Sequence, residues 1–241
     1  MTTTFDFLVI GAGRGGTSLL AGLLDSHPLL EVGFELHSID TLMGRDINQE
    51  TRHLFHERVS SFIRLCDESA SLSTKKYWGN KITTEQIAGL EDHNNTNTDG
   101  KIDIFDTLFN QYLHDKKILF ILRDGRSCVN SKVRRTNQSM DTACKRWLYA
   151  VECYRFLREK HNNNLCIRFE DLLLNPEHTL TSACKFLDVD YSPIMLNGVS
   201  NKKMLPEYQN TGLIRSKAAA RELEDKFFIK IQQALVYCNY I

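Results

Sequence analysis

The chain has 241 residues, of which 42% are hydrophobic and 25% are charged. This is enough apolar material for one sizeable core, so we expect a single α/β domain over residues 1–241. Thirty basic residues balance thirty acidic ones. Because the net charge is zero, we expect neither nucleic acid nor an anionic membrane as a partner, and any anion must be bound by a local cluster of residues.

Targeting signals and metal-binding patterns are not apparent in the sequence. The segment MTTTFDF has neither the basic region nor the apolar core of a signal peptide, and no apolar run reaches the length of about eighteen residues that indicates a membrane span. Seven scattered cysteines form no CxxC pair, which suits a reducing compartment. We therefore expect a cytoplasmic protein without a metal site.

Predicted strands alternate with predicted helices along the chain, which is typical of a central parallel sheet with helices on both faces. The predicted strands cover residues 5–10, 30–34, 77–79, 118–122 and 165–167. The predicted helices cover residues 17–26, 39–43, 51–66, a segment from Thr83, 104–113, a segment after Arg126, 141–157, 176–186 and 216–237. We expect a surface loop over 91–100, an irregular segment over 192–213, and Trp147 in the core.

A glycine-rich turn follows the first strand and opens the first helix, in the sequence GAGRGGTSLLAGLLDSHP. Its glycines are Gly11, Gly13, Gly15 and Gly16. Glycines let the backbone amides converge, and the first turn of a helix adds unpaired N–H groups and the positive end of its dipole. The turn therefore predicts a site for a phosphate or a phosphate-like group.

Two common nucleotide-binding motifs compete for this turn. A Walker A loop requires a lysine after its last glycine, but Thr17 stands there, which disfavours nucleoside triphosphate chemistry. The dinucleotide fingerprint GxGxxG is satisfied by its three glycines, with Glu31 and Glu35 near the distance of a ribose-binding acid. A dinucleotide-dependent oxidoreductase therefore stays open at this point.

A second candidate anion site follows the strand over 118–122, in the sequence RDGRSCVNSKVRR. Ser131 and Arg135 are four residues apart and share one face of a helix. Arg123 directly follows the strand, and we expect it to face the same crevice. Together with Arg14 in the glycine-rich turn, these residues predict two cationic clusters, one for each end of a ligand with two phosphate groups.

Four segments together resemble the sulfotransferases that use 3′-phosphoadenosine 5′-phosphosulfate (PAPS). The first family signature is RSGTTLL, followed by a His-Pro pair and a glutamate. The chain has a similar segment, RGGTSLL, followed by His27-Pro28 and Glu35, with Gly15 in place of the serine. RDGR with its downstream serine and arginine is similar to the second, with Gly125 in place of a proline. YWGNK resembles the GxK segment, and IRFEDLLLNP resembles the RYEDL segment, with Phe169 where a tyrosine is usual.

This resemblance implies a P-loop-like sulfotransferase fold, nearer to the bacterial and tyrosylprotein-type branch than to the cytosolic branch. It implies PAPS as the donor, 3′-phosphoadenosine 5′-phosphate (PAP) as the product, and no metal. The residues that it assigns to the nucleotide are Arg14, Gly15, Gly16, Thr17, Ser18, Arg123, Ser131, Arg135, Arg215 and Lys217.

The resemblance also implies a set of catalytic residues. Lys81 and Arg14 correspond to cations that stabilise the bridging oxygen and the transferring sulfuryl group. Glu35 corresponds to the base of the tyrosylprotein branch. His37 is its competitor, because the cytosolic branch uses a histidine, and a residue two positions later would point to the same side of an extended segment.

The acceptor is less well defined by the sequence. Its determinants are expected in segments 38–66, 91–100 and 192–214. The apolar and aromatic residues there and beside them are Phe34, Leu42, Met43, Phe55, Tyr191, Met195 and Tyr208. They favour a small alcohol or phenol, as in the biosynthesis of small molecules, over a carbohydrate. A nucleotide-binding protein without catalytic activity is a further alternative, and the oligomeric state stays open.

Overall fold

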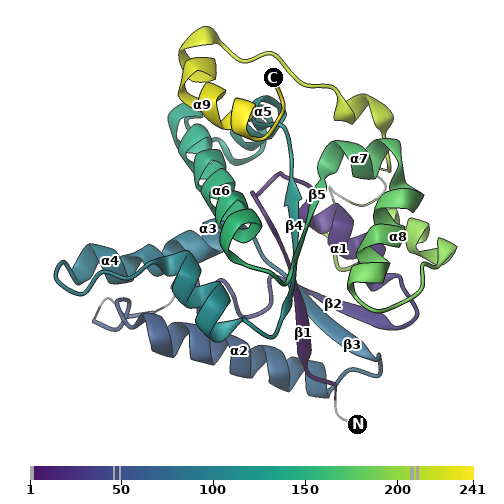
Figure 1. Ribbon diagram of the computed structural model, residues 1–241, viewed down its shortest axis with the longest axis horizontal. Helices are drawn as coiled ribbons and strands as arrows, with labels where there is room; N and C mark the ends of the chain where they lie inside the picture. Colours follow the sequence, from purple (N-terminus) through teal and green to yellow (C-terminus); the bar gives the residue numbers. More distant parts are fainter. Residues whose placement is uncertain (1–2, 46, 49, 207–208, 210–211) are drawn as a thin grey trace.

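A five-stranded parallel sheet forms the centre of the computed structural model, which describes residues 3–45, 47–48, 50–206, 209 and 212–241. The strands are β1 (Phe5–Gly11), β2 (Leu30–Phe34), β3 (Tyr77–Lys81), β4 (Lys117–Leu122) and β5 (Asn164–Arg168). They pair in the order β2-β3-β1-β4-β5, and every pair is parallel (Figure 1). The predicted architecture of a parallel sheet flanked by helices is confirmed.

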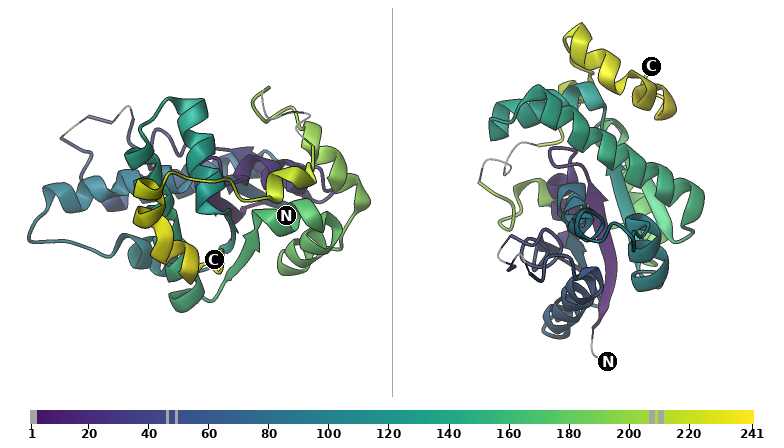
Figure 2. Two further views of the ribbon diagram at one scale, coloured as in Figure 1. Left: turned by 90° about the horizontal axis from the view of Figure 1, so that it is seen from above. Right: turned by 90° about the vertical axis from the view of Figure 1, so that its left-hand side faces the viewer.

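Helices cover both faces of this sheet (Figures 1 and 2). Phe7 and Val9 of β1 point into a core shared with α1 (Thr17–Asp25), α7 (Phe169–Leu174) and α8 (Pro176–Phe186). Leu8 and Ile10 point into the opposite core, shared with α2 (Phe55–Ser71), α6 (Met140–Lys160) and α9 (Asp225–Tyr237). Successive side chains of β1 enter two buried cores in turn, which explains why the sequence of this strand is almost continuously apolar.

Shorter helical segments complete the chain. The α-helical ones are α3 (Thr84–Ile87), α4 (Asp92–Thr96) and α5 (Gly125–Thr136). Short segments of other helix types are η1 (Ala88–Glu91), η2 (Asp106–Tyr112), η3 (Pro193–Ser200) and η4 (Arg215–Ala218). Among the residues that the structure describes, no helix combines the length and the apolar character needed to cross a bilayer.

The predicted helix over 39–43 is wrong, because this segment forms turns. The hydroxyl of Ser38 donates to the carbonyl of Glu35, and that of Thr41 donates to the carbonyl of His37. Such short-range bonds compete with helical ones. The buried guanidinium of Arg58 donates to the carbonyls of Thr41 and Leu42, so the turns are held by a side chain from α2.

Three other boundaries differ from the prediction. The helix predicted over 51–66 is displaced to α2, and the loop predicted over 91–100 contains the short helix α4. The last helix begins at Asp225 rather than at residue 216. Its predicted first turns are instead held against α5, where Ser127 accepts from the Arg221 amide and Asn130 donates to the Glu222 carbonyl.

Trp147 lies in the core, as predicted. Its ring is fully buried, and its indole N–H donates to the carbonyl of Arg123 at 3.0 Å. A side chain at position 125 would bring its Cβ within 2.8 Å of this ring. The contact therefore explains why Gly125 occupies the position where a proline was expected, and it fixes the start of α5 on the sheet.

Candidate active site

The carboxyl ends of four neighbouring strands bring the predicted site residues to one edge of the sheet. Glu35 follows β2, Lys81 ends β3, the glycine-rich loop follows β1, and Arg123 follows β4. β1 lies between β3 and β4, so the chain order reverses at this strand. Ligands of open α/β sheets bind at this kind of switch point.

The glycine-rich loop has the tight geometry of an anion-binding turn. Arg14 and Gly16 have positive φ angles of 71° and 103°. Gly16 directly precedes α1 and has no room for a side chain, because a Cβ there would lie 2.3 Å from the ring of Phe169. Phe169 is only 6% exposed, so its ring has a packing role against the loop.

Part of the loop backbone bonds within the protein. The Gly15 amide, expected to face the ligand, donates to the carbonyl of Ala12 at 2.7 Å. No side chain among the described residues caps α1. The amides of Thr17 and Ser18 at the start of this helix are therefore the donors best placed for an anion.

A buried ion pair beneath the loop was not found from the sequence. Glu85 of α3 pairs with Lys132 of α5, and its other oxygen accepts the Gly13 amide at 2.9 Å. Burial by itself raises the pKa of a carboxyl group, but the Lys132 ammonium and the Gly13 amide hold the pKa of Glu85 below its ordinary value. The only signal in the sequence was the position of Lys132 next to Ser131.

We predict that Lys132→Met destabilises the protein by about 3–5 kcal/mol, because it leaves the Glu85 charge buried without its partner. Chemical denaturation measures this change. The pKa of Glu85 is lower in the folded chain than in the unfolded one, so its pairing stabilises the fold at neutral pH and ceases to do so as the pH falls through the folded-state value. The double variant Glu85→Gln/Lys132→Met should recover most of the loss, and equal stability of the single and double variants would contradict the prediction.

The two predicted cationic clusters meet in the structure. Arg123 donates from Nη1 to the carbonyl of Arg14 at 3.0 Å, and Arg14 donates from Nε to the hydroxyl of Ser131 at 3.2 Å. The Arg123 guanidinium lies 4.6 Å from the centre of the Phe169 ring. Its Nε is buried and has no hydrogen bond within the described part of the chain. Arg135 lies on the same helix as Ser131 but is exposed.

The segment before α9 contributes a third cation. Partial burial and the nearby guanidinium groups of Arg123 and Arg14 lower the pKa of the Lys217 ammonium. The charge of Lys217 is therefore close enough to be affected by those of Arg123 and Arg14, and like charges gathered in this way favour a bound anion. Arg215 is exposed, and nothing in the structure places it in this group.

Glu35 and Lys81 form an ion pair at the ends of β2 and β3. Lys81 is only 4% exposed, and its Nζ lies 2.5 Å from Oε1 of Glu35. The other oxygen of Glu35 accepts from Nε2 of Gln86 at 2.9 Å, while Oε1 of Gln86 accepts from the Thr83 amide. Gln86 was also missed in the sequence, and it fixes the orientation of the Glu35 carboxylate.

The expectation that His37 points to the same side as Glu35 along an extended segment is wrong. Both residues have left-handed backbones, with φ angles of 60° and 62°. The His37 ring forms a hydrogen bond with the Ser69 hydroxyl of α2 at 2.9 Å. The ring of His27 forms hydrogen bonds with the Asp190 carbonyl and the Leu29 amide, which gives this residue a structural role after α1.

Comparison with known proteins identifies the family. The sequence model of the sulfotransferase family matches residues 6–193, which include the glycine-rich loop, Glu35, Lys81 and the second cationic cluster. The chain belongs to the sulfotransferase family of enzymes. Membership excludes the dinucleotide-dependent oxidoreductase that the glycine pattern had left open.

Two curated sulfotransferases share weak sequence similarity with the chain. A protein-tyrosine sulfotransferase of Drosophila melanogaster is 26% identical over 201 residues, which is 78% of this chain and 38% of the relative. Protein-tyrosine sulfotransferase 2 of Gallus gallus is 25% identical over 198 residues, or 78% of this chain and 52% of the relative. The chain thus spans about half the length, or less, of these relatives.

Solved sulfotransferase structures share the fold. The sulfotransferase domain of the curacin biosynthetic pathway has a TM-score of 0.67 at 16% identity and covers 100% of this chain and 99% of its own. The sulfotransferase domain of the Synechococcus PCC 7002 olefin synthase has a TM-score of 0.68 at 15% identity, with 100% and 96% covered. A mouse sulfotransferase complexed with PAP has a TM-score of 0.53 at 11% identity, with 97% and 84% covered.

Proposed function

We propose that this sulfotransferase transfers the sulfuryl group of PAPS to a hydroxyl group of a small organic acceptor. The observation that carries the proposal is the contact of Arg14 with Arg123 and Ser131 beside the start of α1, with the charge of Lys217 close enough to interact with both arginines. The buried Nε of Arg123, which has no hydrogen bond among the described residues, fits a phosphate oxygen. The same convergence of donors suits an adenosine with phosphate groups at its 3′ and 5′ carbons.

The reaction needs a base and a cation close to the sulfur atom. The acceptor oxygen forms a bond to sulfur and gives its proton to the Glu35 carboxylate. The bond between sulfur and the phosphate oxygen breaks, and PAP leaves with the electron pair. Lys81 lies next to Glu35 and supplies the positive charge that stabilises the developing charge on that phosphate oxygen. His37 is bonded to Ser69 of α2, which favours Glu35 as the base.

The nature of the acceptor belongs to the proposal as well. Met43, which was expected to shape the acceptor site, lines a cavity beside the glycine-rich loop. Phe34 directly precedes Glu35, and its ring lies 5.6 Å from Nζ of Lys81. This apolar surface favours a small alcohol or phenol, with a carbohydrate as the second candidate. Tyr208 of the predicted acceptor set lies outside the described residues.

Calorimetry with PAP and with NAD(P) tests the donor site. We expect PAP to bind and NAD(P) not to bind, because the site gathers three cations for two separate phosphate groups. Transfer is then tested with PAPS labelled in its sulfuryl group and a panel of alcohols, phenols and sugars. Absence of PAP binding would remove the proposed function, whereas PAP binding without any labelled product would support the alternative of a non-catalytic nucleotide-binding protein.

A further inference from the structure

A cavity of about 230 Å³ lies beside the glycine-rich loop, on the side of the sheet that carries α6. Its walls come from the turns after β2, from α3 and α4, and from α6. The polar and larger residues among them are Met43, Arg52, Glu85, Asp92, Arg146 and Tyr149. Such a volume suits a small organic molecule rather than a folded partner.

The cavity is connected to the proposed reacting centre through α3. Glu85 lines the cavity and also accepts the amide of Gly13 in the glycine-rich loop. The next residue, Gln86, donates to the Glu35 carboxylate. Two consecutive residues of α3 thus join the wall of the cavity to the glycine-rich loop and to the proposed base.

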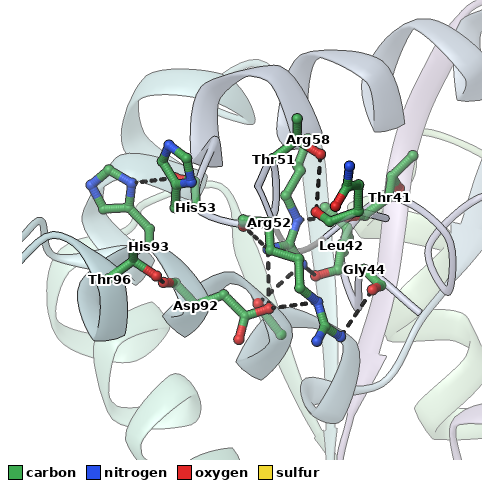
Figure 3. Close-up of polar contacts among 12 residues, drawn as sticks. Thr41, Leu42, Gly44, Thr51, Arg52, His53, Arg58, Asp92, His93 and Thr96 are labelled. Carbon is green, nitrogen blue, oxygen red and sulfur yellow. Dashed lines mark hydrogen bonds and ion pairs between the residues drawn. The ribbon is translucent and has the colours of Figure 1, made fainter. Parts of the chain in front are cut away.

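Both carboxylates in the cavity wall are already paired with cations of the protein. Glu85 pairs with Lys132. Asp92 lies 3.4 Å from Nη1 of Arg58 and 3.5 Å from Nε of Arg52. Figure 3 shows both arginines reaching towards Asp92, with Arg58 extended between the turns of residues 41–44 and α4. These carboxylates need no cation from a ligand.

Two arginine side chains, Arg52 and Arg146, also line the cavity. Arg146 is half-buried and forms no hydrogen bond or ion pair with any residue that the structure describes. Nε of Arg52 is buried, and its approach to Asp92 does not make a hydrogen bond. Arg52 is held in place by its bond to the Gly44 carbonyl at 3.0 Å (Figure 3). Arg146 therefore brings to the wall a positive charge without a partner among the described residues, and this charge favours an anionic group from a ligand.

We propose that this cavity holds the acceptor and that Arg146, with Arg52, binds an anionic group on it. The acceptor class is then a hydroxylated organic acid, with a carboxylate or a phosphate-type group at the end remote from the reacting hydroxyl. A guanidinium matches both groups, because its planar fork can donate two parallel hydrogen bonds. Met43 and Tyr149 supply apolar surface for the carbon skeleton between the two ends. This inference rests on the proposed function.

Calorimetry on the PAP-loaded protein tests the inference with three phenolic probes of similar size. They are 4-hydroxyphenylacetate, 4-hydroxybenzylphosphonate and the neutral 4-hydroxyphenylacetamide. We expect the protein to bind at least one of the two anions more tightly than the amide. The tighter of the two anions identifies which anionic group the cavity prefers. Arg146→Gln should weaken binding of that anion by about tenfold to a hundredfold, as expected for charged hydrogen bonds, and leave the amide unaffected.

Lys145→Gln is the matched control, because it removes the same charge from the neighbouring position of α6, where the side chain is exposed. It should leave binding of all three probes unchanged. Equal binding of the anions and the amide, or equal losses in the two variants, would overturn the inference. PAP affinity, measured first for each variant, reports on the fold and the donor site, so a failure of the proposed function appears there and not in the comparison of probes.

Discussion

Glu35→Gln should lower the turnover of sulfuryl transfer by about a hundredfold to ten-thousandfold, which is the usual contribution of a general base. The glutamine side chain keeps the size of the glutamate, and its single carbonyl oxygen can replace one of the two carboxylate oxygens that accept from Lys81 and Gln86. It cannot take the proton of the acceptor hydroxyl. Labelled PAPS and any acceptor found in the panel measure the change, while calorimetry with PAP should show an unchanged donor affinity.

Two control variants make this result specific. Glu31→Gln changes a carboxylate of β2 that contacts Lys203 and Ser73, away from Lys81, and it should keep full turnover. His37→Asn should have a much smaller effect than Glu35→Gln, because the His37 ring is bonded to Ser69. Loss of turnover in His37→Asn but not in Glu35→Gln would transfer the role of base to the histidine.

Lys81→Met should lower turnover by about a hundredfold to a thousandfold, as removal of a single preorganised donor does in other enzymes. Negative charge develops on the phosphate oxygen as its bond to sulfur breaks, and the buried ammonium of Lys81 is the proposed source of stabilisation. Methionine preserves the length and the apolar stem of the side chain. Single-turnover measurements with saturating PAPS separate this effect from donor binding.

The contact between Lys81 and Glu35 adds a further expectation for this variant. Removal of the lysine leaves the Glu35 carboxylate with its bond from the Gln86 side chain, so the carboxylate should still be held in position. Lys75→Met serves as the control, since Lys75 donates to the Pro28 carbonyl before β2, and it should keep its turnover. A Lys81→Met enzyme with normal single-turnover rates would show that the lysine only pairs with Glu35.

Much of the fold could be predicted because the strand signals are local. Four of the predicted strands agree closely with β1, β2, β4 and β5, and β3 is longer at its end and includes Lys81. The glycine-rich loop and the residues after β4 could be placed at one edge, because parallel strands end together. The meeting of Arg14 with Ser131 and Arg123 follows from that topology.

The parts that the sequence did not reveal depend on contacts between distant segments. The turns at 39–43 are held by Arg58 from α2 and not by a helix. The last helix begins later than predicted because backbone groups of residues 219–222 form hydrogen bonds with the side chains of Ser127 and Asn130 of α5. Glu85, Gln86 and Lys132 carry no motif of their own. Their roles come from contacts with residues far away in the sequence, and the hydrophobic periodicity of a sequence does not reveal such contacts.

The bond from Arg123 to the Arg14 carbonyl ties the ends of β4 and β1 together at the proposed nucleotide site. Occupancy of that site and integrity of the sheet are therefore thermodynamically linked. A ligand at a hundred times its dissociation constant adds about 2.7 kcal/mol to the free energy of unfolding when it binds only the folded chain. Melting curves recorded over a range of nucleotide concentrations would thus rank candidate nucleotides without any knowledge of the acceptor.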